Sequence, residues 1–537
     1  MLTIALFLPL MAKTAEAADP GTSLGPGATG DVWQGALTRK DAAARLRLDL
    51  HPGTYVAGKL QRPGTGLVLD LVREDDSHLR RLVDEDGVRD TFQFLVPQDA
   101  AFLKIHALDG RAEQGAPFKV AITQNLLPGE DVLQETPEEQ LLSPTLQRVA
   151  GKLGDDRETG TFWDEMASRG TPLIEPVDDK TSIVTFLYRG AKTGVRILGA
   201  PSADHDPMTR LGETDIWYRS YELPNDTRLS YRLAPDVPEV PGTFWERRVA
   251  ILATAQADPL NLDPWPAESI DRFSRKSVLK LPDAPELPFT EKRDGKAGTV
   301  RDMAFTSDTL GNTRPVSLYT PAKFDPSDPE TVLLVLFDGE AYQSDVSVPV
   351  ILDNMQADGV IPQTVAILIA NPDLETRGRE LPGNEPFADV IARELVPFAA
   401  RELKVSVPPE RTALAGSSYG GLASTRLALA YPEIFGNVIS MSGSYWWSPE
   451  GTPPERAEYM ANKVAAAERA GIRFFLTAGL FETGRAGRLD ILNTNRHLRT
   501  VLDAKGYEVT LREYAGAHDY LIWQGALSDG LIALFGN

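Results

Sequence analysis

The sequence predicts a multidomain protein in which two β-sandwich-like domains precede a C-terminal doubly wound α/β sheet. Three observations lead to this prediction. At 537 residues the chain is too long for a single hydrophobic core. Its first half contains short runs that alternate apolar and polar residues, typical of antiparallel sheets. After Lys296, strongly apolar strands alternate with helix-length amphipathic stretches, which is typical of a parallel sheet covered on both faces.

Composition excludes several classes of protein. Hydrophobic residues make up 42% of the chain and charged residues 24%, as in ordinary globular proteins. The net charge of -21 argues against a nucleic-acid partner, since such proteins present a basic face. Cysteine is absent, which excludes disulfides, thiolate metal sites and cysteine nucleophiles. No apolar run reaches the ~20 residues of a membrane span.

The N-terminus resembles a secretory signal. An apolar block from Leu2 to Met11 is followed by Ala15-Glu16-Ala17, which fits the small-x-small rule for cleavage. We therefore expect residues 1–17 to be a signal peptide and the mature protein to be exported, to the periplasm. Because no charged residue precedes the block, a buried first strand or a misassigned start is the alternative.

Turn-forming and proline-rich stretches divide residues 18–537 into four regions. Alternating runs from Arg45 to Thr123 predict a small antiparallel β-sandwich, and an acidic, proline-containing stretch with two short helical patterns follows it. A second β-rich region starts near Thr181 and ends at the proline-rich stretch Leu281–Pro288. The expected ranges are an accessory β-sandwich over 18–127, an acidic and helical connector over 128–180, a second β-sandwich over 181–290 and the α/β domain over 291–537.

The α/β region begins with a hairpin pattern, residues 300–306 and 315–320, around Gly311-Asn312. Buried strands are expected at residues 331–337, 364–370, 412–415, 438–441, 473–478 and 508–514, with helices at 389–403, 422–431 and 492–504 between them.

A G-x-S-x-G motif, Gly416-Ser417-Ser418-Tyr419-Gly420, lies between a predicted strand and a predicted helix. A strand runs directly into it and a helix runs directly out, as in the nucleophile elbow of the α/β-hydrolase fold. The glycines would leave room for a sharp turn. Ser418 is therefore the candidate nucleophile, exposed at the carboxyl edge of the sheet.

A serine hydroxyl needs a base at neutral pH, and only two of the six histidines follow the elbow. His518 lies in the loop after the last strand, where this fold places its base, whereas His497 lies within a helical pattern. The acid should follow the penultimate strand. Glu482 and Asp490 both qualify; Glu482 is preferred because it is nearer the strand end.

Two backbone N–H groups should stabilise the oxyanion. Tyr419, directly after the nucleophile, is expected to supply one. The other should come from the loop Asp338-Gly339-Glu340 after the first buried strand, at Gly339 or Glu340.

At this point the sequence resembles the enterochelin (ferric enterobactin) esterases of the esterase D-like branch of the α/β-hydrolases. The resemblance covers about Thr181 to Asn537. Its motifs are Ala415-Gly416-Ser417-Ser418-Tyr419-Gly420-Gly421-Leu422, Ser442-Gly443-Ser444-Tyr445-Trp446-Trp447, Arg377-x-x-Glu380-Leu381-Pro382, Ala478-Gly479-x-x-Glu482, Gly516-x-His518-Asp519-x-x-x-Trp523 and Asp258-Pro259-Leu260-Asn261. The first β domain and the export signal depart from the two-domain, typically cytoplasmic members of that family.

The resemblance implies a serine esterase that opens the trilactone of ferric catecholate siderophores, with a small-molecule substrate and no metal or organic cofactor. An anionic, aromatic substrate favours guanidinium and aromatic partners. The candidates are Arg377, Arg379, Trp446, Trp447 and Trp523. Salt bridges to Glu375 or Glu380 and burial in the core are the alternative roles for these residues.

Two other functions fit the sequence. The same scaffold could hydrolyse feruloyl or simple acyl esters, and a binding protein with a vestigial hydrolase domain would carry the same fold. The sequence does not specify an oligomeric state.

Overall fold

The computed structural model describes residues 23–27, 29–37, 43–62, 66–84, 90–108, 116–129, 133, 140–152, 159–202, 204–484 and 490–536. The predicted signal peptide lies outside these residues, and so does most of the acidic stretch before residue 140. Residues Met1–Asp131 and Val237–Thr254 form one compact unit, and Val132–Asp236 with Ala255–Asn537 form the other. Among the described residues, no helix is both long and apolar enough to cross a membrane.

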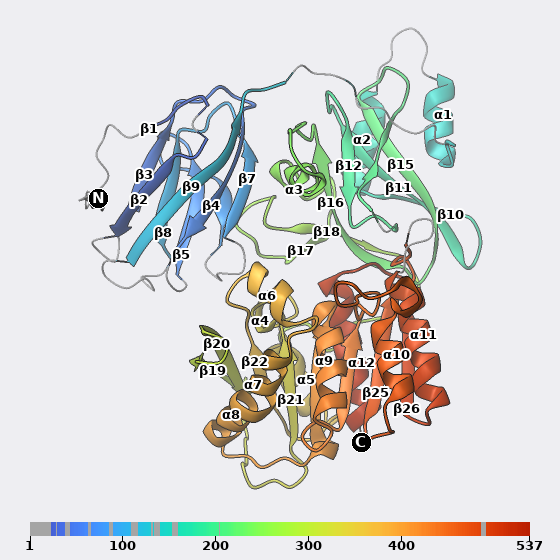
Figure 1. The fold of residues 1–537 in the computed structure, drawn as a ribbon. Coiled ribbons are helices and arrows are strands. Elements are labelled where there is room, and N and C mark those ends of the chain that lie inside the picture. Colours follow the sequence, from blue (N-terminus) through green and yellow to red (C-terminus); the bar gives the residue numbers. More distant parts are fainter. Residues whose placement is uncertain are drawn as a thin grey trace, which may run out of the picture. The chain divides into compact units, whose positions relative to one another are not determined.

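Two sheets enclose the core of the first unit (Figure 1, blue). Their orders are β1-β3-β8-β5-β6 and β2-β9-β4-β7. Leu69 and Leu103 of the first sheet and Val56 and Phe94 of the second are fully buried in one cluster. The strands are β1 (Ser23–Leu24), β2 (Val32–Leu37), β3 (Ala43–Leu48), β4 (Tyr55–Gln61), β5 (Leu67–Val72), β6 (His78–Val83), β7 (Thr91–Leu95), β8 (Phe102–Ala107) and β9 (Ala116–Leu126).

A distant segment completes this unit. Val237–Thr254 contains α3 (Phe244–Ala250) and η1 (Ile251–Ala253), and it belongs with the first sheets although the predicted range 181–290 includes it. Ala250 and Ala253 pack against Tyr55 of β4, and Arg80 of β6 donates to the Leu252 carbonyl at 2.8 Å. Such contacts join residues far apart in the chain, so sequence patterns do not reveal them.

The second unit begins with α1 (Pro144–Lys152) and α2 (Gly160–Arg169), close to the expected helical patterns. Trp163 of α2 packs against Leu187 and Tyr218, so this helix covers one of the two sheets that follow. Those sheets have the orders β10-β11-β15-β14 and β13-β12-β16-β18-β17. Their strands are β10 (Leu173–Pro176), β11 (Thr181–Arg189), β12 (Val195–Leu198), β13 (Asp206–Pro207), β14 (Thr209–Arg210), β15 (Ile216–Pro224), β16 (Arg228–Pro235), β17 (Pro264–Trp265) and β18 (Lys276–Lys280).

The rest of this unit is an α/β-hydrolase-like sheet with the order β19-β20-β22-β21-β23-β24-β25-β26. The β19–β20 hairpin is antiparallel, and the strands from β22 to β26 pair in parallel. The strands are β19 (Thr299–Ser307), β20 (Asn312–Thr320), β21 (Val332–Phe337), β22 (Thr364–Ile369), β23 (Thr412–Ser417), β24 (Asn437–Met441), β25 (Arg473–Gly479) and β26 (Glu508–Tyr514).

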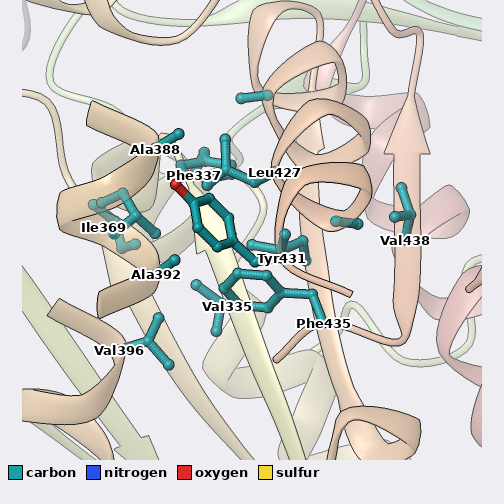
Figure 2. Close-up of a cluster of buried hydrophobic side chains, with 14 of the residues drawn as sticks. Val335, Phe337, Ile369, Ala388, Ala392, Val396, Leu427, Tyr431, Phe435 and Val438 are labelled. Atoms are coloured by element: carbon teal, nitrogen blue, oxygen red, sulfur yellow. The ribbon is translucent and has the colours of Figure 1, made fainter. Parts of the chain in front are cut away.

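Helices cover both faces of this sheet, which explains why central strands such as β21 are buried along their whole length. On one face Phe337 and Val335 pack against Leu427 and Tyr431 of α9 and its end (Figure 2). The other face packs against Leu352 of α5 and the helix α12. The helices are α4 (Gly339–Ser344), α5 (Val348–Ala357), α6 (Leu374–Glu380), α7 (Glu385–Val390), η2 (Ile391–Leu395), α8 (Val396–Leu403), η3 (Pro409–Arg411), α9 (Tyr419–Ala430), η4 (Pro454–Arg456), α10 (Tyr459–Ala466), α11 (Ile491–Ala504) and α12 (Tyr520–Phe535).

Candidate active site

Ser418 occupies the single residue between β23 and α9, with φ 56° and ψ -118°. Such a backbone conformation is strained for a residue with a side chain, and it persists where the surrounding structure enforces it. A Cβ on Gly416 would lie 2.6 Å from the Gly420 carbonyl carbon, and one on Gly421 would lie 2.5 Å from Ser440 Oγ. A Cβ on Gly420, the second glycine of the motif, would meet no atom nearer than 3.4 Å. The close packing therefore requires glycine at positions 416 and 421 but not at position 420.

His518 is bound by Glu482. His518 Nδ1 lies 2.5 Å from Glu482 Oε1, and a carboxylate can only accept, so the proton is on Nδ1 and Nε2 is free to act as a base. The Glu482 side chain is 2% exposed and its other oxygen accepts from Gly479 N at 2.6 Å. Asp490, the other candidate, instead caps α11 by accepting from Asn493 N at 2.6 Å. Of the two acids, the structure brings Glu482 to the imidazole.

Ser442, which lies in one of the family motifs but was not predicted as a site residue, links the acid to a buried tryptophan. Its Oγ donates to Glu482 Oε2 at 2.7 Å and accepts from Trp523 Nε1 at 3.1 Å. Trp523 is 4% exposed, and its ring stands edge-on to His518 with centroids 4.8 Å apart. Trp523 therefore supports the acid and base from the protein interior. The signal available in the sequence was the position of Ser442, directly after a buried strand at the edge that carries the elbow.

The Ser418 hydroxyl contacts another serine. Its Oγ lies 3.1 Å from Ser444 Oγ, a buried group from the loop after β24. The hydrogen bonds of the described residues include none between Ser418 and His518. Catalytic hydrogen bonds are often long or absent in a free enzyme and form when substrate binds. Ser444, like Ser442, has a contact that sequence reasoning missed.

The two loops expected to form an oxyanion hole meet beside the elbow. Tyr419 is the first residue of α9, and Gly339 and Glu340 begin α4 after Asp338, which has a left-handed φ of 56°. A Cβ on Gly420 would lie 3.4 Å from Asp338 Oδ2, which places this loop against the first turn of α9. The Glu340 carboxylate accepts from Asn371 Nδ2 at 2.9 Å. Burial, with the nearby Asp338 charge, raises the pKa of Glu340 to about 7.

Arg377 belongs to this loop system. Its Nε and Nη2 each donate to one oxygen of Asp338 at 2.7 Å, and its guanidinium lies 5.8 Å from the centroid of the Tyr419 ring. Burial lowers the pKa of Arg377, but the attraction of Asp338 outweighs it and the pKa rises. The salt bridge considered from the sequence was to Glu375 or Glu380; the structure forms it with Asp338. Arg377 thus holds the loop that carries Gly339.

The remaining predicted substrate contacts differ in their exposure. Arg379 has a side chain that is 56% exposed; its Nη1 lies 3.9 Å from Glu375 Oε1, the salt bridge considered from the sequence, and its Nη2 donates to Thr376 Oγ1 at 3.2 Å. Trp446 is 38% exposed, and its ring lies 6.1 Å from that of Tyr419, next to the nucleophile. Trp447 packs against the main core and edge-on to Tyr459. Trp446 and Arg379 are therefore exposed to solvent and can meet a substrate, whereas Trp447 packs against the core and Trp523 supports the acid and base through Ser442.

The chemistry available here is acyl transfer, because a strained serine at a helix N-terminus lies on the same sheet edge as a histidine with an oriented imidazole. Fold and site thus define an ester hydrolase of the α/β-hydrolase class. Comparison with known proteins agrees: the family described as Esterase matches residues 307–534, and "Enterochelin esterase, N-terminal" matches residues 183–289.

The chain belongs to the enterobactin esterase family. The iron(III) enterobactin esterase of Dickeya dadantii is 31% identical over 69% of this chain and 91% of its own length, and the iron(III) salmochelin esterase of Escherichia coli is 32% identical over 70% and 93%. The ferric enterobactin esterase structure from Salmonella typhimurium superposes with a TM-score of 0.57 at 28% identity, covering 70% of this chain and 98% of that one. The enterobactin esterase of Shigella flexneri, solved in the presence of enterobactin, gives 0.56 at 29% identity over 70% and 97%. This protein is a carboxylic ester hydrolase.

Proposed function

We propose that this protein hydrolyses the trilactone of ferric catecholate siderophores of the enterobactin type, and so helps to release their iron. The observation that carries the proposal is the extent of the family match, which includes both the α/β domain with Ser418 and the β-rich region before it. Two relatives, named iron(III) enterobactin esterase and iron(III) salmochelin esterase, align with this chain over most of their own length.

The proposed reaction follows from the geometry of the site. Ser418 Oγ attacks an ester carbonyl while His518 Nε2 accepts its proton, and the N–H groups of Tyr419 and of the Gly339–Glu340 turn stabilise the oxyanion. His518 then gives the proton to the leaving alkoxide. Water, activated by the same imidazole, attacks the acyl-serine and frees the acid product and Ser418. Glu482 fixes the tautomer that makes Nε2 the base throughout.

The surroundings of Ser418 suit a substrate that is aromatic and anionic. Trp446 and Tyr419 offer ring faces next to the nucleophile, and the exposed Arg379 offers a guanidinium that can meet catecholate oxygens. Arg377 acts indirectly in this proposal, because Asp338 already occupies two of its donors.

The proposal also places the reaction outside the cytoplasm. An apolar N-terminal block and an Ala-x-Ala sequence support export to the periplasm with cleavage after Ala17. We take the two regions with paired sheets as β-sandwich-like domains that precede the catalytic one. Fractionation of cells with an antibody against the C-terminal domain, together with N-terminal sequencing, tests the export; an uncleaved cytoplasmic protein contradicts it.

The substrate is tested by incubating the mature protein with ferric and iron-free enterobactin and following ring opening by mass. We expect opening by the wild-type protein and none by the matched variant Ser418→Ala. Turnover of feruloyl or simple aryl esters without any opening of either siderophore form contradicts the proposal and supports a general esterase. Failure of the wild-type protein to react with a fluorophosphonate would instead support a non-catalytic binding protein.

A further inference from the structure

The residue that follows His518 is a buried carboxylate held by the neighbouring β-rich region. Asp519 is 4% exposed and is the N-cap of α12. Its Oδ2 accepts from the backbone N–H of Ser230 at 2.8 Å, and its Oδ1 accepts from Lys276 Nζ at 3.0 Å. Burial raises the pKa of Asp519, but the Lys276 charge and the Ser230 hydrogen bond outweigh it, so the carboxylate stays ionised.

The same region also holds the other end of the histidine loop. The backbone N–H of Arg228 donates to the Ala515 carbonyl at 3.0 Å. Arg228 and Ser230 alternate along β16, and alternate amide groups of a strand point to the same side. A Cβ on Gly516 would lie 3.1 Å from the Arg228 carbonyl oxygen, so β16 runs close against the loop. His518 therefore lies between two points of attachment.

Lys276 is itself fixed in place. It lies on β18, which pairs with β16, and its ammonium group lies 5.2 Å from the centroid of the Trp265 ring. Its side chain is 31% exposed, while that of Asp519 is 5% exposed. An ion pair with one buried partner is screened less than a pair on the surface, and loss of the lysine would leave an uncompensated charge in the interior.

We propose that Lys276 and the strand β16 position the catalytic base, so that the β-rich region controls the rate of ester hydrolysis through Asp519. Lys276 acts through another residue and is a positioning residue. The inference rests on the hydrolase activity of Ser418 and His518 and not on the identity of the siderophore. It assigns the β-rich region a part in the chemical step, separate from any contact with substrate.

The consequence of removing Lys276 follows from the burial of its partner. An ionised Asp519 without a cation is unfavourable, so the carboxylate must take up a proton or the loop must move toward water. Either response displaces His518 or changes the charge beside it. Small displacements of a catalytic group reduce the rate, and about 10- to 100-fold is the scale for a shift near 1 Å.

The test compares Lys276→Met with Lys280→Met on a small aryl ester, in the full-length protein. Lys280 lies on the same strand, but its partner is the exposed Glu286, so Lys280→Met is the matched control. For Lys276→Met we expect kcat to fall about 10-fold or more with KM within about twofold, and the acid limb of the pH profile to move. Lys280→Met should match the wild type, and Lys276→Arg should recover most of the loss.

Equal kcat and equal pH profiles for wild type and Lys276→Met would overturn the proposal, and so would a loss that Lys276→Arg does not recover. If Lys276→Met does not fold, Asp519→Asn gives the second measurement. The amide oxygen can still accept from Ser230, but the amide NH2 cannot accept from Lys276 or Leu521 and carries no charge, so the melting temperature should fall and the pH profile should move; an unmoved profile overturns the proposal. Hydrolysis of a simple ester measures the chemical step without siderophore recognition. Failure of the protein to open a siderophore would therefore not contradict the role proposed for Lys276.

Discussion

Replacement of Arg377 by methionine should destabilise the protein and reduce its activity on every ester, whatever the acyl group. The change removes two hydrogen bonds of 2.7 Å to Asp338, whose carboxylate is 2% exposed. Breaking a buried ion pair by removing one partner costs about 3–5 kcal/mol. For a domain of this size each kcal/mol lowers the melting temperature by about 2–4 °C, so a decrease of roughly 6–20 °C is expected.

Activity should fall in parallel, because Asp338 directly precedes Gly339 at the expected oxyanion turn. The assay is kcat/KM for a simple aryl ester and for a ferric catecholate, with calorimetry of the same samples. The double variant Arg377→Met with Asp338→Asn should recover part of the stability, because no unpaired charge is left. An unchanged melting temperature together with a loss confined to the ferric catecholate would refute this reasoning and make Arg377 a substrate ligand.

Four further variants test the acid, its support and the oxyanion turn. Glu482→Gln should lower kcat by about 10³- to 10⁴-fold, whereas Asp490→Ala should cost only about 1 kcal/mol of stability as a lost helix cap; equal kcat losses in steady-state assays would contradict the assignment. Ser442→Ala should lower kcat about 10-fold with little effect on KM, since it removes one of the two donors to Glu482 Oε2 and leaves Trp523 Nε1 without its acceptor; an increase in KM alone would count against it. Glu340 has a folded-state pKa raised from 4.5 to about 7, so its contribution to stability is complete below 4.5 and is lost as the pH rises through 7. In denaturant titrations from about pH 5 to 8 the free energy of unfolding should therefore fall by at most about 3 kcal/mol, and Glu340→Gln should flatten that slope.

The sequence predicted the order of elements in the catalytic sheet closely, because its strands and helices carry strong periodic patterns. It also predicted Ser418 and His518, whose positions depend on the elbow and on chain order. It preferred Glu482 to Asp490 only because Glu482 is nearer the strand end; both follow β25, and the contact of Glu482 with the imidazole is visible only in the structure. The signal peptide and the export remain predictions.

Contacts between side chains from distant parts of the chain could not be predicted from the sequence. Asp338 lies 39 positions from Arg377, and nothing in the spacing pairs them. Trp446 and Trp447 are neighbours in one motif, yet Trp446 is exposed and Trp447 is partly buried against the core, since adjacent residues point in different directions. The attachment of Asp519 to Ser230 and Lys276 joins two regions that sequence analysis had treated as separate domains.

The segment Val237–Thr254 limits how the protein can be cut into fragments that fold alone. Because the chain leaves the second unit after Asp236 and returns at Ala255, the first unit is made of two separate stretches, one N-terminal and one inserted. A truncation that begins at residue 132 would delete the sheets of the first unit but keep α3 and η1, and Ala250 and Ala253 would lose the apolar partners they have on β4. A fragment designed to fold alone must also replace residues 237–254 with a short turn.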